Sequence, residues 1–206
     1  MGETVDRFPL FPLGIVLLPG EVLPLHIFEE RYKTMIGECL EADTEFGIVW
    51  LSDDGLREVG CTARVTQVLA ELDDGRLNIL VAGGRAFRLM RRIDDMAYPA
   101  GDVELLDDFA PEADATLVQQ AQVRYAELVE AATEEKPDMD EIAELDAYGM
   151  AATVEHPAEA KQALLELRSE NDRLRMVDEM FRTAIKRVAY AEEAAERAQT
   201  NGSVPH

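Results

Sequence analysis

The chain has 206 residues, of which 47% are hydrophobic, enough to form one sizeable core or two small ones. Its 20 Lys and Arg residues stand against 42 Asp and Glu residues, a formal net charge of −22 that is shared evenly between the two halves of the sequence. Because nucleic acids and anionic membranes are bound through cationic side chains that neutralise several phosphates, this balance makes both of them poor partners.

Residues 8–40 join a proline-rich apolar segment to an amphipathic helix. Prolines at positions 9, 12, 19 and 24 exclude a continuous helix or a membrane span over residues 8–26, because proline lacks an N–H and favours extended geometry in the residue before it. We expect a strand over 8–18, a turn at Pro19-Gly20 and an extended, mostly buried run that leads into a helix of about 29–42. Glu29 and Lys33 are spaced for an ion pair on this helix. Its apolar face comprises Phe28, Tyr32, Met35, Ile36, Cys39 and Leu40.

The middle of the chain predicts a series of β-strands. Asp73-Asp74-Gly75-Arg76 predicts a hairpin turn, since glycine readily adopts the positive φ that such turns need. After Gly83-Gly84 the sequence continues as a strand, so we expect a β-bulge or tight turn there and not a phosphate-binding loop, which requires a following helix. Alternating or short apolar runs place the strands at 46–51, 61–72, 77–82, 85–93 and 102–106.

From Asp107 onward the apolar period changes from 2 to about 3.6 residues, which indicates helices. The last helix has a packing seam of Leu174, Val177, Phe181 and Val188. Helices are expected over 114–133, from the capping residue Asp138 through Leu145, over 158–167 and over about 171–199. The sequence therefore predicts a β-rich domain over 6–108, a helical domain over 109–199 and a disordered tail over 200–206.

Two blocks of the sequence resemble a known family. The run PLFPLG…LLPGEVLPLHIFEERY is similar to the opening of the Lon protease N-terminal (substrate-binding) domain, especially its stand-alone bacterial form. A second block, VGCTARVTQVLAELDDGRLNILVAGGRAFRL at 59–89, fits the same family in the same order. The family usually carries an Arg-Phe pair where this chain has Ala86-Phe87, with Arg85 one residue earlier.

This resemblance implies an α+β fold, in which a PUA-like β-barrel or sandwich forms the N-terminal domain and a helical bundle follows it. It also implies a non-catalytic module that binds protein substrates or polypeptide segments in an extended or unfolded form. The ATPase and Ser–Lys peptidase parts of Lon are missing from this sequence.

The residues themselves provide no catalytic, cofactor or metal motif. There is no Gly-x-Ser-x-Gly elbow and no phosphate-cradling P-loop, and the three histidines, at 26, 156 and 206, are isolated from one another. We therefore expect no enzymatic activity, no cofactor and no metal. Cys39 and Cys61 belong to different predicted elements and are expected to be free thiols. With no recognisable targeting segment, this predicts a cytoplasmic protein.

The candidate binding site is the cluster Phe28, Glu29, Arg31 and Tyr32 at the junction of strand and helix. Apolar side chains beside this helix would line a groove for extended polypeptide, and an exposed strand edge would add main-chain hydrogen bonds. The alternative interpretation is structural: the two aromatic residues anchor the helix to the sheet, and Glu29 and Arg31 make fixed ion pairs.

Other partners and functions remain open. PUA-like folds often bind RNA, and Arg85, Arg88, Arg91 and Arg92 offer the one basic patch, although the net charge disfavours nucleic acid. An enzymatic interpretation rests on the family's peptidase name and not on any residue of this chain. A second copy of the chain, bound through the final helix, would form a homodimer.

Overall fold

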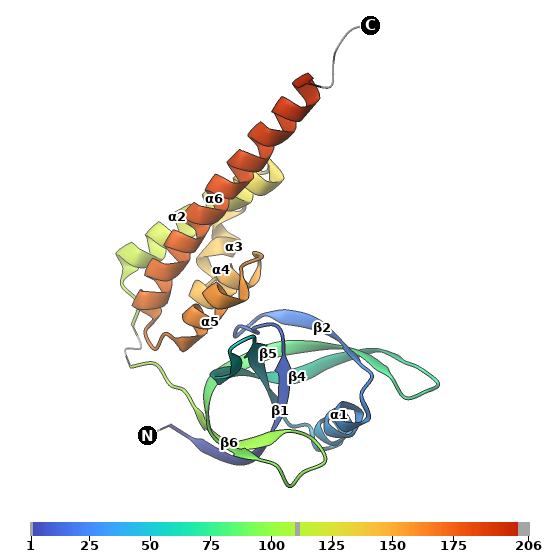
Figure 1. Cartoon of the computed structure of the whole chain (residues 1–206). Coiled ribbons are helices and arrows are strands. Elements are labelled where there is room, and N and C mark those ends of the chain that lie inside the picture. The colour runs from blue at the N-terminus through green and yellow to red at the C-terminus, as the bar shows by residue number, and fades with distance from the viewer. Residues whose placement is uncertain (1, 110–111, 202–206) are drawn as a thin grey trace, which may run out of the picture.

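The first half of the chain folds into a six-stranded mixed sheet (Figure 1). The computed structural model describes residues 2–109 and 112–201. The strands lie in the order β2-β5-β4-β3-β1-β6, and neighbours are antiparallel except for the parallel pair β1 and β3. Their bounds are β1 Thr4–Leu13, β2 Val22–Ile27, β3 Phe46–Ser52, β4 Gly55–Glu71, β5 Leu77–Ile93 and β6 Ala100–Leu105.

β5 is long enough to pair with three strands. It pairs with β4 on one side; on the other side its first part, up to Ala82, pairs with β2, and its second part, from Phe87, pairs with β6. Because β6 also pairs with β1, the strands β5, β4, β3, β1 and β6 close into a ring. β2 is an additional strand attached outside this ring.

A β-bulge marks the place where β5 changes partner. The register between β4 and β5 shifts so that Thr62 faces both Gly84 and Arg85, and the Thr62 hydroxyl accepts the Arg85 backbone N–H at 2.9 Å. A Cβ atom at Gly83 would lie 2.0 Å from the carbonyl oxygen of Leu18, so only glycine allows this approach of the N-terminal segment. The bulge predicted at these glycines is confirmed.

Four strand predictions need correction. The strand expected over 8–18 is β1, which begins at Thr4 and ends at Leu13, because the chain bends at Gly14 and Ile15. The runs 77–82 and 85–93 form one continuous strand, because the bulge bends β5 without ending its pairing. β4 begins at Gly55 and not at residue 61, since its first part pairs with β3. The run before Phe28, expected to be mostly buried, is the half-exposed strand β2. The predicted hairpin turn is confirmed, with Gly75 at φ +76°.

Helix α1 (Glu30–Ala42) packs against the sheet (Figure 1). Phe28 precedes the helix and is 60% exposed, and Leu40 is 41% exposed. The predicted apolar face was therefore too wide, because the sheet covers only the centre of the face. The buried residues of α1 are Tyr32, Met35, Ile36 and Cys39.

Helices α2 to α6 follow the sheet. Asp114 and Asp138 cap α2 and α3 with their carboxylates, as predicted. The helix expected to run through Leu145 ends earlier, at Ala143, because Asp146 caps a further helix, α4, that was not predicted. The bounds are α2 Ala115–Thr133, α3 Met139–Ala143, α4 Ala147–Ala152, α5 Ala158–Glu166 and α6 Glu170–Asn201.

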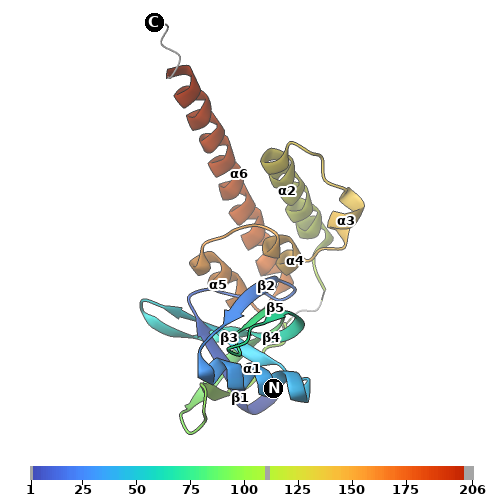
Figure 2. The same cartoon turned by 90° about the vertical axis from the view of Figure 1, so that its right-hand side faces the viewer.

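α6 is the longest helix described, and Figure 2 shows it diverging from α2 away from the sheet. Of the predicted seam, Leu174, Val177 and Phe181 are buried, and Val188 is partly buried. The helix continues to Asn201, beyond its predicted end, and the remainder of the predicted tail lies outside the described residues.

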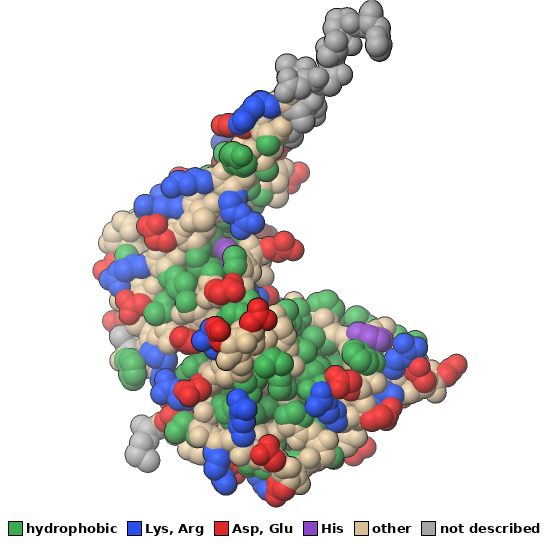
Figure 3. Space-filling view, in the orientation of Figure 1, with side chains coloured by type: hydrophobic (Ala, Val, Ile, Leu, Met, Phe, Trp, Pro, Cys, Tyr) green, Lys and Arg blue, Asp and Glu red, His purple; other side chains and the backbone are tan. Residues whose placement is uncertain are grey.

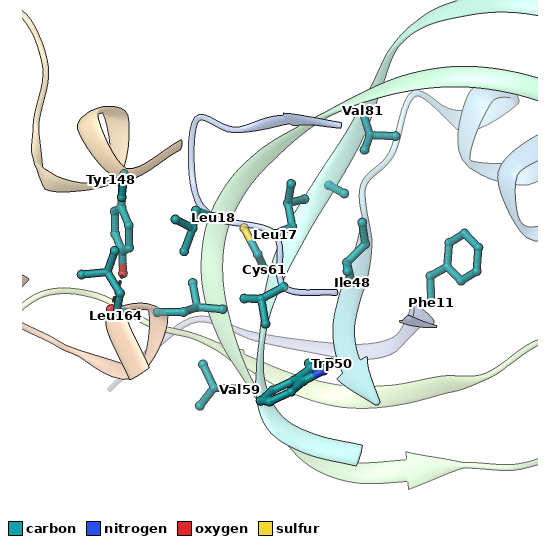
Figure 4. Packing of buried hydrophobic residues seen from close by; sticks show 14 of the residues in the cluster. Phe11, Leu17, Leu18, Ile48, Trp50, Val59, Cys61, Val81, Tyr148 and Leu164 are labelled. Atoms are coloured by element: carbon teal, nitrogen blue, oxygen red, sulfur yellow. Dashed lines mark hydrogen bonds between the residues drawn. The ribbon is translucent and has the colours of Figure 1, made fainter. Parts of the chain in front are cut away.

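The helices rest on the sheet through buried side chains (Figure 4). Leu18 and Val59 lie opposite Tyr148 of α4 and Leu164 of α5, and all four belong to one hydrophobic cluster that extends through both parts of the chain. The Gln162 side-chain amide donates to the Val59 carbonyl oxygen at 3.1 Å across this contact. The helical part is therefore fixed against the sheet by a shared core.

Two further observations bear on the class of protein. None of the described helices is both long and apolar enough to span a membrane. Cys39 and Cys61 are buried free thiols, as predicted.

Candidate functional site

The junction between β2 and α1 exposes an aromatic side chain. β2 ends at the buried Ile27, α1 begins at Glu30, and Phe28 between them is 60% exposed. The Phe28 ring stacks on His26, with ring centroids 5.9 Å apart, and His26 Nδ1 is hydrogen bonded to Asn78 Oδ1 of β5 at 2.6 Å. The exposed ring is thus held in place from the sheet side.

The Arg31 guanidinium lies on the first turn of α1 and contacts Glu29 and Tyr32. It forms an ion pair with Glu29, whose carboxylate oxygen is 2.7 Å from Arg31 Nη2. It also lies over the Tyr32 ring, 4.5 Å from the ring centroid. Glu29 occupies the N-cap position of α1 without capping it through its side chain, since its carboxylate binds Arg31 instead. The predicted pair of Glu29 with Lys33 is therefore not formed.

Tyr32 belongs to the core. It is 5% exposed, and its ring lies against Phe11 of β1 with centroids 4.1 Å apart. Burial is the main cause of the raised pKa of Tyr32, and the nearby Arg31 opposes it. The Arg31 guanidinium thus packs on an aromatic ring that belongs to the core.

Lys33 fixes α1 to the hairpin between β4 and β5. Its ammonium group donates to Glu30 Oε1 and to the Asp74 carbonyl oxygen, each at 2.8 Å. These hydrogen bonds join the first turn of α1 to the hairpin.

The four predicted site residues thus lie together but play different parts. Phe28, Glu29 and Arg31 reach the surface, whereas Tyr32 is buried beneath Arg31. His26 also contributes and was not included in the predicted site. The alternation of apolar residues about Pro24 in the sequence VLPLHI was the signal for an edge strand with one exposed face.

Two arginines of the basic patch considered for RNA, Arg85 and Arg91, are paired with acid. Arg85 binds Glu3 and Asp107, and Arg91 binds Asp102 with an N–O distance of 2.6 Å. These carboxylates compete with phosphate for the guanidinium groups.

Over residues 2–109 and 112–201, no group of three or more His, Cys, Asp and Glu side chains is placed to hold a metal ion. The Ser52 hydroxyl donates to the Gly55 carbonyl oxygen within the turn that joins β3 and β4.

Comparison with known proteins points to one family. Residues 7–182 match the model of the ATP-dependent protease La (LON) substrate-binding domain. Lon protease 1 of Hydrogenovibrio crunogenus is 25% identical over 196 residues, and the Lon protease of Paraburkholderia phytofirmans is 27% identical over 205 residues. These alignments cover 86% and 92% of this chain but 24% and 25% of the two proteases, so the chain spans about a quarter of their length.

Solved structures show the same fold. A Lon N-terminal domain protein from Xanthomonas campestris has a TM-score of 0.65 at 24% identity, covering 84% of this chain and 97% of that one. The N-terminal domain of a Mycobacterium avium complex Lon protease has a TM-score of 0.63 at 20% identity, covering 87% and 98%.

Proposed function

The chain belongs to the family of LON substrate-binding domains, and we propose that it is a non-catalytic module that binds extended or unfolded polypeptide. The observation that carries the proposal is the exposed ring of Phe28, which is stacked on His26 at the end of β2. An exposed aromatic ring held by stacking gains contact area with a ligand and loses little side-chain entropy on binding.

The binding is expected to be weak and independent of ATP. Ordering a disordered chain offsets much of the contact free energy, so a dissociation constant in the micromolar range or weaker is expected, which corresponds to about −8 kcal/mol or less in magnitude. The acidic surface, with a net charge of −22, favours neutral or basic segments over acidic ones.

The experiment is a titration with wild type and variants of a fluorescently labelled model protein, ribonuclease A, which is basic and is kept unfolded by reduction and by alkylation with iodoacetamide, a reagent that adds no charge. Phe28→Ala and Arg31→Ala are expected to weaken binding by about tenfold, or about 1.4 kcal/mol. Phe109→Ala is the matched control, because Phe109 is 81% exposed but lies in the connection after β6. It should bind like wild type.

Two outcomes would contradict the proposal. Equal binding by a folded Phe28→Ala variant would move the site elsewhere. If wild type does not bind the model protein at a protein concentration of hundreds of micromolar, the proposed function is wrong. Tyr32 is unsuitable for this test, since its buried ring supports the fold.

The absence of catalysis is part of the same proposal. The family match that supports it concerns the substrate-binding domain. Casein should remain intact on incubation with the protein, with and without ATP. Appearance of acid-soluble fragments would contradict this.

We also propose the finer architecture and partners. The closed ring of strands supports a PUA-like barrel over 6–108, and helices α2 to α6 support a bundle over 109–199. The projecting α6 offers a surface for a homodimer, which sedimentation at several concentrations would detect. A cytoplasmic location agrees with two free thiols. Nucleic acid remains a disfavoured partner because the patch arginines Arg85 and Arg91 are paired with acid.

A further inference from the structure

In the part of the chain that the structure describes, the outer edge of β2 is an unpaired ladder of main-chain groups. Among the described strands, β2 is hydrogen bonded to β5 alone, and its pairing from Val22 to Ile27 has no register shift. The end of β4 near the hairpin also lacks a second partner, but its register shifts at Val65/Gln67 and again at Val68/Ala70. Because bulges of this kind disrupt an edge, β2 is the regular one of the two.

The register shows which residues face outward. Glu21 is the residue immediately before β2, and its carbonyl oxygen accepts the Gly83 backbone N–H of β5 at 2.8 Å. In an antiparallel ladder every second residue is hydrogen bonded to the partner strand. Leu23 and Leu25 therefore direct their N–H and carbonyl groups toward β5, as Glu21 does with its carbonyl. Val22, Pro24 and His26 therefore direct their main-chain groups outward.

Pro24 interrupts this edge at its centre. Val22 and His26 each offer an N–H and a carbonyl, whereas Pro24 offers a carbonyl alone. Proline is tolerated in a sheet where its missing N–H would have pointed to solvent. It leaves the edge usable by a partner strand but with one donor fewer at the centre.

The side chains along the same strand provide apolar contacts. Val22 is 58% exposed at one end and Phe28 is 60% exposed just beyond the other end. Figure 3 shows an open notch between the helical part and the part of the molecule that carries β2, with hydrophobic side chains on its floor. The notch leaves room for another chain along the strand.

We propose that the outer edge of β2 binds the polypeptide by strand addition, with hydrogen bonds at Val22 and His26 and a weakened position at Pro24. This inference rests on the proposed function and names its binding mode. The occupant is an extended backbone, because a helix has already used its N–H and carbonyl groups internally and cannot satisfy a strand edge. Main-chain recognition explains how one site accepts segments of different sequence.

Backbone N-methylation of the ligand tests this mode. The probe is a labelled peptide of about ten residues, the tightest binder in an overlapping set from the model protein, since about ten residues is the upper length of ordinary strands. One derivative is N-methylated at every second residue and the other at the intervening residues. In an added strand only alternate N–H groups face the partner, so one derivative should lose at least about tenfold in affinity and the other less than about threefold.

A protein variant tests the same edge from the other side. Pro24→Val restores the missing N–H and should tighten binding of the unmodified peptide by about two- to tenfold. Pro137→Val, in the connection between α2 and α3, is the matched control and should leave the affinity unchanged. Thermal unfolding shows that each variant is folded before it is titrated.

The outcomes separate the two proposals. If the unmodified peptides and the model protein do not bind, the proposed function fails and this inference fails with it. If they bind but both methylated derivatives lose or keep affinity equally, strand addition alone is overturned. Looser binding by folded Pro24→Val would also overturn it.

Discussion

Lys161 of α5 and Glu21 of the turn before β2 form an ion pair with an N–O distance of 2.6 Å, although 140 positions separate them in the chain. Their side chains are 14% and 15% exposed. The Glu21 carboxylate also accepts the Leu18 backbone N–H at 2.9 Å. A single carboxylate thus fixes the turn that leads into β2 and joins it to the helical part.

Replacing Lys161 with Met should lower the free energy of unfolding by about 3 kcal/mol, because the Glu21 carboxylate would stay largely buried without its cation. Urea unfolding followed by the fluorescence of Trp50 measures the change. The control is Arg197→Met, which removes the exposed pair with Glu193 and should cost less than about 1 kcal/mol. A Lys161→Met variant as stable as this control would contradict the prediction.

Phe181→Ala should lower the free energy of unfolding by about 3–5 kcal/mol, since the ring is fully buried and its removal leaves a cavity. The ring packs against Tyr125 of α2, with centroids 5.5 Å apart. Tyr190→Ala on the same helix removes a side chain that is 69% exposed and should change stability by less than about 0.5 kcal/mol. Similar losses for the two variants would show that α6 does not pack through Phe181 in solution.

Both cysteines should be present as slow-reacting thiols. Cys39 and Cys61 are 3% and 0% exposed, and burial raises the pKa of each above its ordinary value, so little thiolate is available. A thiol reagent is expected to modify neither in the native protein within minutes, and to count two in the unfolded, never-reduced protein. A count of zero after unfolding would mean that a disulfide forms.

The pH dependence of stability should carry a contribution from His156. Burial, aided by Lys161 and Arg187, lowers the pKa of His156 from 6.5 to about 4. Between these values the unfolded chain binds a proton that the folded chain does not, so stability is full above pH 6.5 and is lost as the pH falls toward 4.

His156→Leu should remove this contribution, because leucine stays neutral at every pH. The difference in unfolding free energy between wild type and variant is expected to change by about 2 kcal/mol between pH 7 and pH 4, after allowing for the partial exposure of the ring. Urea titrations of both proteins across this range provide the measurement. A difference that stays constant with pH would contradict the assignment.

The sheet and the helices should unfold together, since Leu18 and Leu164 bury against a shared core. Trp50 reports on the sheet and far-ultraviolet circular dichroism mainly on the helices, so the two urea transitions should coincide. Leu164→Ala should lower both midpoints. Two separate transitions in wild type would instead show that the proposed domains are independently stable.

Local chemistry made much of the fold predictable. The Asp73-Asp74-Gly75-Arg76 turn, the caps at Asp114 and Asp138 and the seam of α6 each depend on residues close together in the chain. The order of strands and helices and the family resemblance follow from such local signals, and the family match confirms the resemblance. The helix α4 was missed because it is short and its buried residues give no long periodic pattern.

The sequence by itself therefore determined most of the elements, the change from strands to helices near Asp107 and the position of Phe28, Glu29 and Arg31 at a junction of strand and helix. Only the tertiary structure decided that Tyr32 is buried, that β2 pairs with β5 alone among the described strands and that Lys161 joins the two parts. Helix caps and turns involve neighbours a few residues apart, whereas burial and strand pairing depend on which distant segment comes to lie alongside. That choice belongs to the packing of the whole chain, and no single stretch of it carries the information.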